Sequence, residues 1–176
     1  GWWRHEHAGG ANISTPVAGD DGIFFFSSAY GVGSRAIQLK KDGDKYTTEE
    51  LFFNKKMKIH HGNAIRIGDY VYASSGDFGP AFFAAVNVKT GKFAWKKRGI
   101  TKANSLLADG KLIILDEDGV LYLAKVTPKK IEILCESQVL QKTAWSAPTL
   151  VGDTLYIRDL KRIMAVDLSV RSVAKG

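Results

Sequence analysis

The sequence predicts an all-β chain that folds as four consecutive four-stranded antiparallel sheets. Helical periodicity is almost absent, and apolar residues come in short runs broken by Gly-Asp, Asp-Gly and Thr-Gly turns, which is typical of a β-meander. The turns also recur, because Asp20, Gly68, Asp109 and Gly152 follow one another at steps of 48, 41 and 43 residues. Aromatic residues make up 11% of the 176 residues, a share that favours strands.

Each repeat contains the same four segments in the same order. First strands are expected within STPVAGDD, HGNAIRIGD, ANSLLADG and SAPTLVGD. Second strands are expected at residues 22–26, 70–73, 111–115 and 154–157. Third strands are expected at residues 35–39, 82–88, 120–124 and 162–166. Fourth strands are expected at residues 48–52, 92–95 and 131–134, with a less regular candidate at 169–173.

Repeats of about 40–50 residues with four strands each are typical of propeller blades, which must stack radially to bury both faces. We therefore expect residues 1–176 to form a single β-propeller segment of about four four-stranded antiparallel blades. The expected blades cover residues 8–55, 56–100, 101–143 and 144–176. Residues 1–7 look like the outer-strand end of a preceding blade, and Trp95 is expected to dock between neighbouring blades.

Two segments resemble a known repeat. AVNVKTGKFAW, residues 85–95, resembles the repeat of the quinoprotein-type (PQQ-like repeat) β-propellers, in which an alanine, an aspartate, a Thr-Gly-Lys turn and a tryptophan recur. The aspartate position is Asn87 in this chain. Residues 146–168 are similar to the first three strands of such a blade, with Ala165-Val-Asp167 at the alanine-to-aspartate step. Since such propellers commonly have eight blades, the resemblance implies half a ring.

A half ring exposes apolar blade faces and strand edges, so partners are expected to cover them. The expected partners are the remaining blades, from the same chain or another chain, or a second copy. The family includes dehydrogenases that use pyrroloquinoline quinone and calcium. It also includes non-enzymatic members such as the lipoprotein of the outer-membrane assembly machine, found in the bacterial periplasm or cell envelope.

Resemblance to the non-enzymatic members implies a scaffold without cofactor, metal or catalytic residues. Such a scaffold would bind a protein, peptide or polysaccharide through its loops or channel mouth. The alternative is part of a quinoprotein-like oxidoreductase whose decisive residues lie in other blades. The two adjacent cysteines typical of those enzymes are not available here, because Cys135 is the single cysteine. It is expected to be buried.

Charge and hydropathy restrict the partners further. The net charge of +7 is spread over short clusters rather than one stripe, so a nucleic acid is not the expected partner. A basic surface for an acidic polymer is a third hypothesis. No apolar run is long enough to cross a membrane, and the chain starts without the pattern of an export signal, so any such signal has been removed or lies elsewhere.

Alignment of the four repeats indicates a candidate site at the channel mouth. Two equivalent positions precede the first strands, and they hold Ile13, His61, Lys102 and Trp145, then Thr15, Asn63, Asn104 and Ala147. Polar and aromatic side chains that converge on a concave mouth are typical of ligand sites. The predicted ligand-binding residues are His61, Asn63, Lys102, Asn104 and Trp145.

Two neighbouring groups are expected not to bind a metal. His60 and His61 are adjacent, and adjacent side chains of a strand point to opposite faces. Asp77 and the acidic run 116–118 are interpreted as turn residues rather than calcium ligands.

Overall fold

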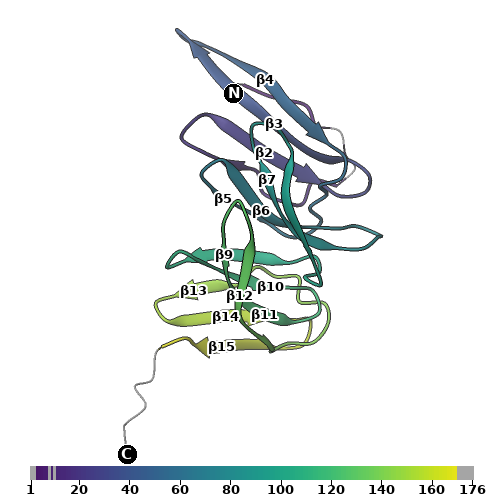
Figure 1. Cartoon of the computed structure of the whole chain (residues 1–176), viewed down its shortest axis with the longest axis vertical. Helices are drawn as coiled ribbons and strands as arrows, with labels where there is room; N and C mark the ends of the chain where they lie inside the picture. Colours follow the sequence, from purple (N-terminus) through teal and green to yellow (C-terminus); the bar gives the residue numbers. More distant parts are fainter. Residues whose placement is uncertain (1–2, 8, 10, 170–176) are drawn as a thin grey trace, which may run out of the picture.

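The computed structural model describes residues 3–7, 9 and 11–169 of the chain. Within them, every regular element is a β-strand, and the strands form four antiparallel sheets. Figure 1 shows the sheets stacked one after another, in chain order, along the longest axis of the molecule. The prediction of an all-β fold made of blade-like antiparallel sheets is confirmed.

In each sheet the strands lie side by side in chain order. The first sheet contains β1 (Val17–Ala18), β2 (Ile23–Ser28), β3 (Gly33–Asp42) and β4 (Lys45–Asn54). The second contains β5 (Ala64–Ile67), β6 (Tyr70–Ser75), β7 (Phe82–Asn87) and β8 (Phe93–Arg98). The third contains β9 (Asn104–Ala108), β10 (Lys111–Leu115), β11 (Val120–Val126) and β12 (Ile131–Gln138). The last contains β13 (Thr149–Val151), β14 (Thr154–Arg158) and β15 (Ile163–Asp167).

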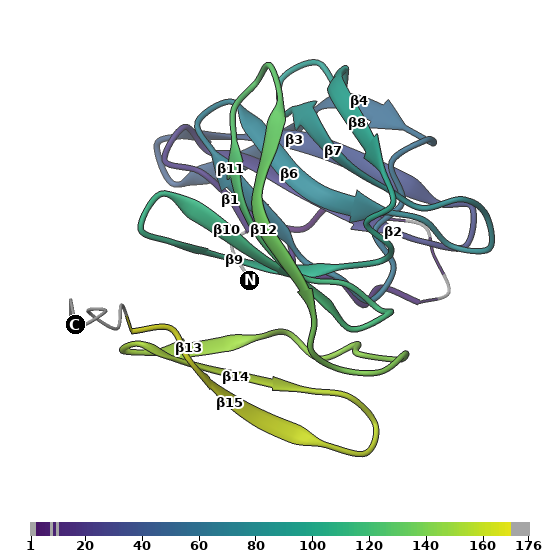
Figure 2. The same cartoon turned by 60° about the horizontal axis from the view of Figure 1, so that its bottom comes forward.

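The last sheet lies at one end of the stack in both Figure 1 and Figure 2. It has three strands within the described residues. The fourth strand expected at 169–173 falls outside the described residues except for Ser169, which is not in a strand.

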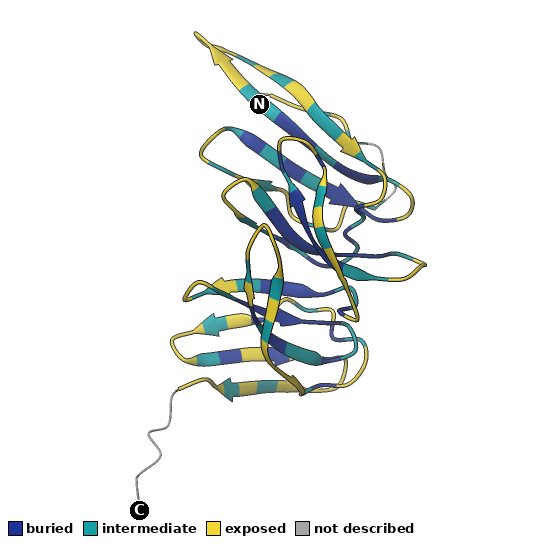
Figure 3. Ribbon diagram, in the orientation of Figure 1, coloured by how far each residue is buried: buried dark blue, intermediate teal, exposed yellow. Residues whose placement is uncertain are grey.

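Three hydrophobic clusters fill the spaces between consecutive sheets. In β6, Val71 and Ala73 pack toward the first sheet, whereas Tyr72 packs toward the third. Burial of one large apolar side chain stabilises a fold by about 1.5–3 kcal/mol, so these clusters hold the stack together. Figure 3 shows long buried stretches along β6, β7 and β10, while the outer strand β12 is mostly exposed.

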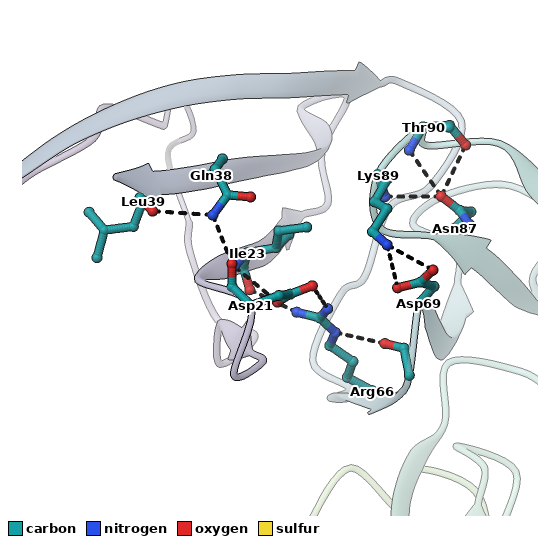
Figure 4. Close-up of polar contacts among 10 residues, drawn as sticks. Asp21, Ile23, Gln38, Leu39, Arg66, Asp69, Asn87, Lys89 and Thr90 are labelled. Carbon is teal, nitrogen blue, oxygen red and sulfur yellow. Dashed lines mark hydrogen bonds and ion pairs between the residues drawn. The ribbon is translucent and has the colours of Figure 1, made fainter. Parts of the chain in front are cut away.

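The Thr-Gly turn between β7 and β8 joins the second sheet to the first. Figure 4 shows the hydrogen bonds of Asn87 within the turn. Asn87 Oδ1 accepts hydrogen bonds from the backbone N–H groups of Lys89 at 3.0 Å and Thr90 at 3.1 Å. Gly91 has a φ of 68°, and a Cβ there would lie 2.4 Å from the ring of Phe52 in the first sheet. The amide of Asn54 donates to the Gly91 carbonyl at 2.7 Å. The Thr-Gly turn therefore packs the second sheet against the first.

Arg66 of β5 makes a second set of contacts with the first sheet, at the same end of the sheets (Figure 4). Its guanidinium donates to the Ile23 carbonyl at 2.9 Å and lies 2.6 Å from a carboxylate oxygen of Asp21, both in the first sheet region. The side chain of Arg66 is only 8% exposed. The polar hollow of about 360 Å³ beside it is lined by Arg66 and Asp21 and also by Asp20 and Asp69.

Trp95 joins the second and third sheets, as predicted. Its ring lies 6.0 Å from that of Tyr72 and 6.3 Å from that of Phe83, measured between centroids. Its Nε1 donates to the carbonyl of Thr127, between β11 and β12, at 2.9 Å. Burial of the ring edge and one hydrogen bond thus anchor the outer strand β8.

The expectation of a buried Cys135 is wrong, because the thiol is exposed. A β-bulge interrupts the pairing of β11 with β12 between Leu123 and Ala124, and the partners step from Cys135 to Ile133. Beyond the bulge the alternation of buried side chains along β12 ends. Similar bulges interrupt the third-to-fourth strand pairing of the first two sheets.

The two ends of the stack differ from its interior. The described residues 3–7 are not in a strand, and Trp3 contacts Phe24 with ring centroids 5.1 Å apart. At the other end, the last sheet and its turns carry exposed apolar side chains: Val151 (62%), Tyr156 (42%), Leu160 (71%), Ile163 (75%) and Leu168 (40%). Exposed apolar patches of this kind are typical of interaction surfaces.

Candidate functional site

Two kinds of loop leave the sheets at the same end. Because the strands are antiparallel, the loop after each second strand and the connection to the next sheet start at the same edge. The loops after second strands cover residues 29–32, 76–81, 116–119 and 159–162, and the connections cover 55–63, 99–103 and 139–148. We call this edge of the stack the loop end.

The structure brings three of the five predicted residues together at the loop end. His61 and Trp145 are stacked, with ring centroids 4.7 Å apart and an interplanar angle of 28°. Lys102 Nζ lies 3.2 Å from a carboxylate oxygen of Glu117, and Trp145 Nε1 donates to Glu117 at 3.2 Å. Glu117, which the sequence analysis had assigned to a turn, therefore joins Lys102 to Trp145.

The other two predicted residues connect neighbouring sheets. Asn63 Nδ2 donates to the carbonyl of Ser105 at 2.8 Å, and the Ser105 N–H donates back to Asn63 Oδ1 at 2.7 Å. Asn104 is buried, and its Nδ2 donates to the carbonyl of Trp145 at 3.2 Å. Both amides thus fix the distance between one sheet and the next, and their polar atoms are used within the fold.

Three further aromatic residues extend the His61–Trp145 stack. Tyr30 lies 5.0 Å from His60 and 5.5 Å from Phe78, and His60 lies 5.2 Å from His61, all between ring centroids. The Tyr30 hydroxyl and His60 Nε2 are 2.7 Å apart, within hydrogen-bond distance. We call this set the aromatic row; its members are Tyr30, His60, His61, Phe78 and Trp145.

The row comes from four different loops or connections, yet its outer members reach solvent. Phe78 is 87% exposed, Trp145 is 47% exposed and Tyr30 is 46% exposed. Sequence reasoning missed Tyr30 and Phe78, although both lie in loops after second strands. Alignment of those loops, rather than of the first strands alone, would have placed them at one end.

The expectation that His60 and His61 point to opposite faces is wrong. Both rings contact Trp145, at 6.1 Å for His60 and 4.7 Å for His61. The pair lies in the connection 55–63, which is not a strand, so the alternation of an extended strand does not apply.

Both histidines of the row are held in the neutral form near pH 7. Burial, with a smaller effect of His60, lowers the pKa of His61 to about 4. Burial and Lys102 lower the pKa of His60 as well. Both ring nitrogens of His61 and Nδ1 of His60 are covered and have no hydrogen-bond partner among the described residues.

Two residues of unusual backbone geometry hold the row. Tyr30 has a φ of 55° and Thr143 a φ of 75°, in the left-handed region that bulky and β-branched residues rarely adopt. The N–H groups of Thr143 and Ala144 both donate to the carbonyl of Glu117, at 2.7 and 3.1 Å. Strain of this kind is concentrated at functional sites and costs about 1–3 kcal/mol per residue.

Charges beside the row are paired. Lys58 Nζ lies 2.8 Å from both carboxylate oxygens of Asp77, whose side chain is only 8% exposed. Burial opposes ionisation of Asp77, but the hydrogen bonds from Lys58 and from two backbone N–H groups hold its pKa below the usual value.

Asp116 is buried, and burial raises its pKa. Its carboxylate accepts hydrogen bonds from the N–H groups of Asp118 at 3.1 Å and Val120 at 3.0 Å.

Within the described ranges, no group of three or more His, Cys, Asp or Glu side chains is arranged to hold a metal ion. Nor does any helix of that part of the chain reach the length and apolar content needed to cross a membrane.

Comparison with known proteins shows the fold. No family model matches the chain, and no curated protein matches it. Among solved structures, the crystal structure of BamB from Moraxella catarrhalis matches 86% of this chain with a TM-score of 0.55 and 16% sequence identity. The chain spans 41% of the length of that structure. At this identity the likeness shows the fold alone, and the chain is a segment with a β-propeller-like fold.

Proposed function

We propose that this chain is a non-enzymatic propeller scaffold of the periplasm or cell envelope that binds a protein partner through the aromatic row. The observation that carries the proposal is the row itself: five rings from four loops and connections contact one another in succession, and the outer members are exposed. Aromatic side chains are enriched at protein interfaces and supply most of their binding energy. The cell-envelope location follows from the resemblance to exported propellers.

The contacts beside the row support binding rather than catalysis. The Tyr30 hydroxyl is engaged with His60, and Trp145 Nε1 with Glu117. The neighbouring lysines are paired with carboxylates. These contacts orient the rings, so the ring faces are the feature that a partner meets. No contact among the described residues favours the oxidoreductase alternative.

The proposal includes a second partner surface, the exposed apolar patch on the last sheet. We assign this patch to further propeller blades, because each interior sheet of the stack buries both of its faces against neighbours. The match to 41% of a longer propeller chain is consistent with additional blades. The native mass of the chain tests whether a second copy covers the patch.

Site-specific photo-cross-linking tests the first surface. A benzophenone side chain at position 78 is expected to give a discrete protein adduct in cells that produce the chain. The same group at Leu134, an exposed residue of β12 (41%), serves as the control. Adducts of equal intensity from both positions, or a polysaccharide adduct at position 78, would contradict the proposal.

A further inference from the structure

We propose that the aromatic row recognises an extended, proline-rich segment of the partner; this deepens the proposed function and rests on it. The first argument is charge. Both histidines are neutral near pH 7, and the charges beside the row are held in two pairs, Lys58 with Asp77 and Lys102 with Glu117. A row that presents no net charge favours a neutral ligand over an acidic or basic one.

The second argument is hydrogen bonding. The polar atoms of the row are engaged with one another or covered: Tyr30 with His60, Trp145 with Glu117, and both ring nitrogens of His61 beneath the surface. A saccharide presents many hydroxyl groups that need partners, and burial without them is costly. Proline lacks a backbone N–H and brings an apolar ring, so it makes few such demands.

The third argument is geometry. A polyproline II segment has three residues per turn and advances about 9 Å per turn, so every third residue lies on the same face. The two consecutive steps from Tyr30 to His60 and from His60 to His61 measure 5.0 and 5.2 Å between centroids. One turn of the ligand is longer than each spacing between neighbouring rings of the row, so successive turns contact different rings. Proline-rich segments dock on aromatic-lined surfaces of this kind because they are already extended before binding.

The fourth argument is rigidity. The left-handed residues Tyr30 and Thr143 and the bonds from Asn63 and Asn104 to the next sheet fix the row before any partner arrives. A rigid surface and a stiff ligand lose little conformational entropy on association.

Fluorine NMR of the 5-fluorotryptophan-labelled chain tests the inference, with the Trp145 resonance assigned through Trp145→Phe. The probe is an acetylated decaproline peptide, compared with a Gly-Ser decapeptide and with maltohexaose. We expect a saturable shift of the Trp145 resonance with decaproline alone. The resonance of Trp95, which lies in the interface between the second and third sheets, serves as the internal reference and is expected not to move.

Variants locate the binding. Phe78→Ser removes an 87% exposed ring and is expected to weaken decaproline binding about three- to tenfold, the worth of one aromatic contact. Leu134→Ser, which removes a 41% exposed apolar side chain from the outer strand β12, is the matched control and is expected to leave the affinity unchanged. Equal melting curves for both variants and the parent chain show that neither effect comes from unfolding.

Three outcomes overturn the inference: no shift with decaproline, an equal shift with the Gly-Ser peptide, or a shift with maltohexaose instead. The experiments distinguish failure of the proposed scaffold function from failure of the proposed proline-rich ligand. A protein adduct at position 78 that decaproline does not displace keeps the scaffold function and removes the proline-rich ligand. Displacement of that adduct by decaproline supports both.

Discussion

Substitution of Gly91 tests whether the turn between β7 and β8 stabilises the packing of the second sheet against the first. Replacement by Ala puts a Cβ 2.4 Å from one ring carbon of Phe52 and 2.6 Å from another, far inside van der Waals contact. The ring cannot swing away freely, because Phe52 packs against the cluster between the first two sheets. The φ of 68° adds the cost of a left-handed alanine, about 1–2 kcal/mol. With overpacking of about 1–3 kcal/mol, the free energy of unfolding is expected to fall by about 2–5 kcal/mol.

Gly110→Ala is the matched control for that experiment. Gly110 has nearly the same φ, 66°, but nothing lies within 4 Å of the position of a Cβ. Urea denaturation of both variants therefore separates backbone strain, which they share, from the clash with Phe52. Phe52→Leu in the Gly91→Ala background should recover part of the loss, since the two positions are in contact. If Gly91→Ala loses no more stability than Gly110→Ala, close packing of Gly91 against Phe52 does not stabilise the contact between the two sheets.

Three other predictions concern the pH dependence, the Arg66 contacts and the exposed end of the stack. The pKa of His61 is lowered to about 4 in the folded chain, below its unfolded value of about 6.5, so stability is full above pH 6.5 and is lost as the pH falls toward 4. Urea titrations should show that the free energy of unfolding falls by on the order of 2 kcal/mol over that range. His61→Gln should reduce this fall without abolishing it, because the pKa of His60 is lowered too. An unchanged pH profile in the variant would contradict the prediction. Arg66→Ala should cost about 1–3 kcal/mol of unfolding free energy, since a largely buried guanidinium loses its hydrogen bonds to the Ile23 carbonyl and to Asp21. Lys40→Ala, at a pair whose members are 60% and 57% exposed, should cost under about 0.5 kcal/mol; similar costs would refute the argument. Light scattering should give a native mass above that of one chain, and Ile163→Asp should shift it toward one chain; a monomeric parent chain with a cooperative melt would show that the four sheets need no further blades.

The strand order and the turn chemistry could be predicted from the sequence because both depend on local signals. Asn87 accepts hydrogen bonds from residues two and three positions later in the chain, so the local sequence alone predicts this turn. The same holds for the second strands, whose apolar runs are bounded by glycine and aspartate. The position of Trp95 followed from its place at the end of an outer strand.

The failures have equally specific causes. Cys135 was expected to be buried because its run is apolar, but a bulge ends the alternation before that residue. His60 and His61 were assumed to be extended, whereas they lie in a connection that brings both rings onto Trp145. Tyr30 was missed because its ring reaches the row through a left-handed backbone, which tyrosine gives no sign of adopting.

The two aligned positions that first indicated the site turn out to have different roles. His61, Lys102 and Trp145 precede the first strands and project their side chains into the loop end, where stacking and Glu117 connect them. Two residues after His61 and after Lys102, Asn63 bonds to the backbone of Ser105 in the third sheet, and Asn104 bonds to the backbone of Trp145, in the connection before the last sheet. Hydrogen bonds from side-chain amides to the backbone of neighbouring segments therefore hold the segments that carry His61 and Trp145, in addition to the contact between the two rings. A surface built in this way keeps its shape when one ring is removed, which is why single-ring substitutions can report on binding without reporting on folding.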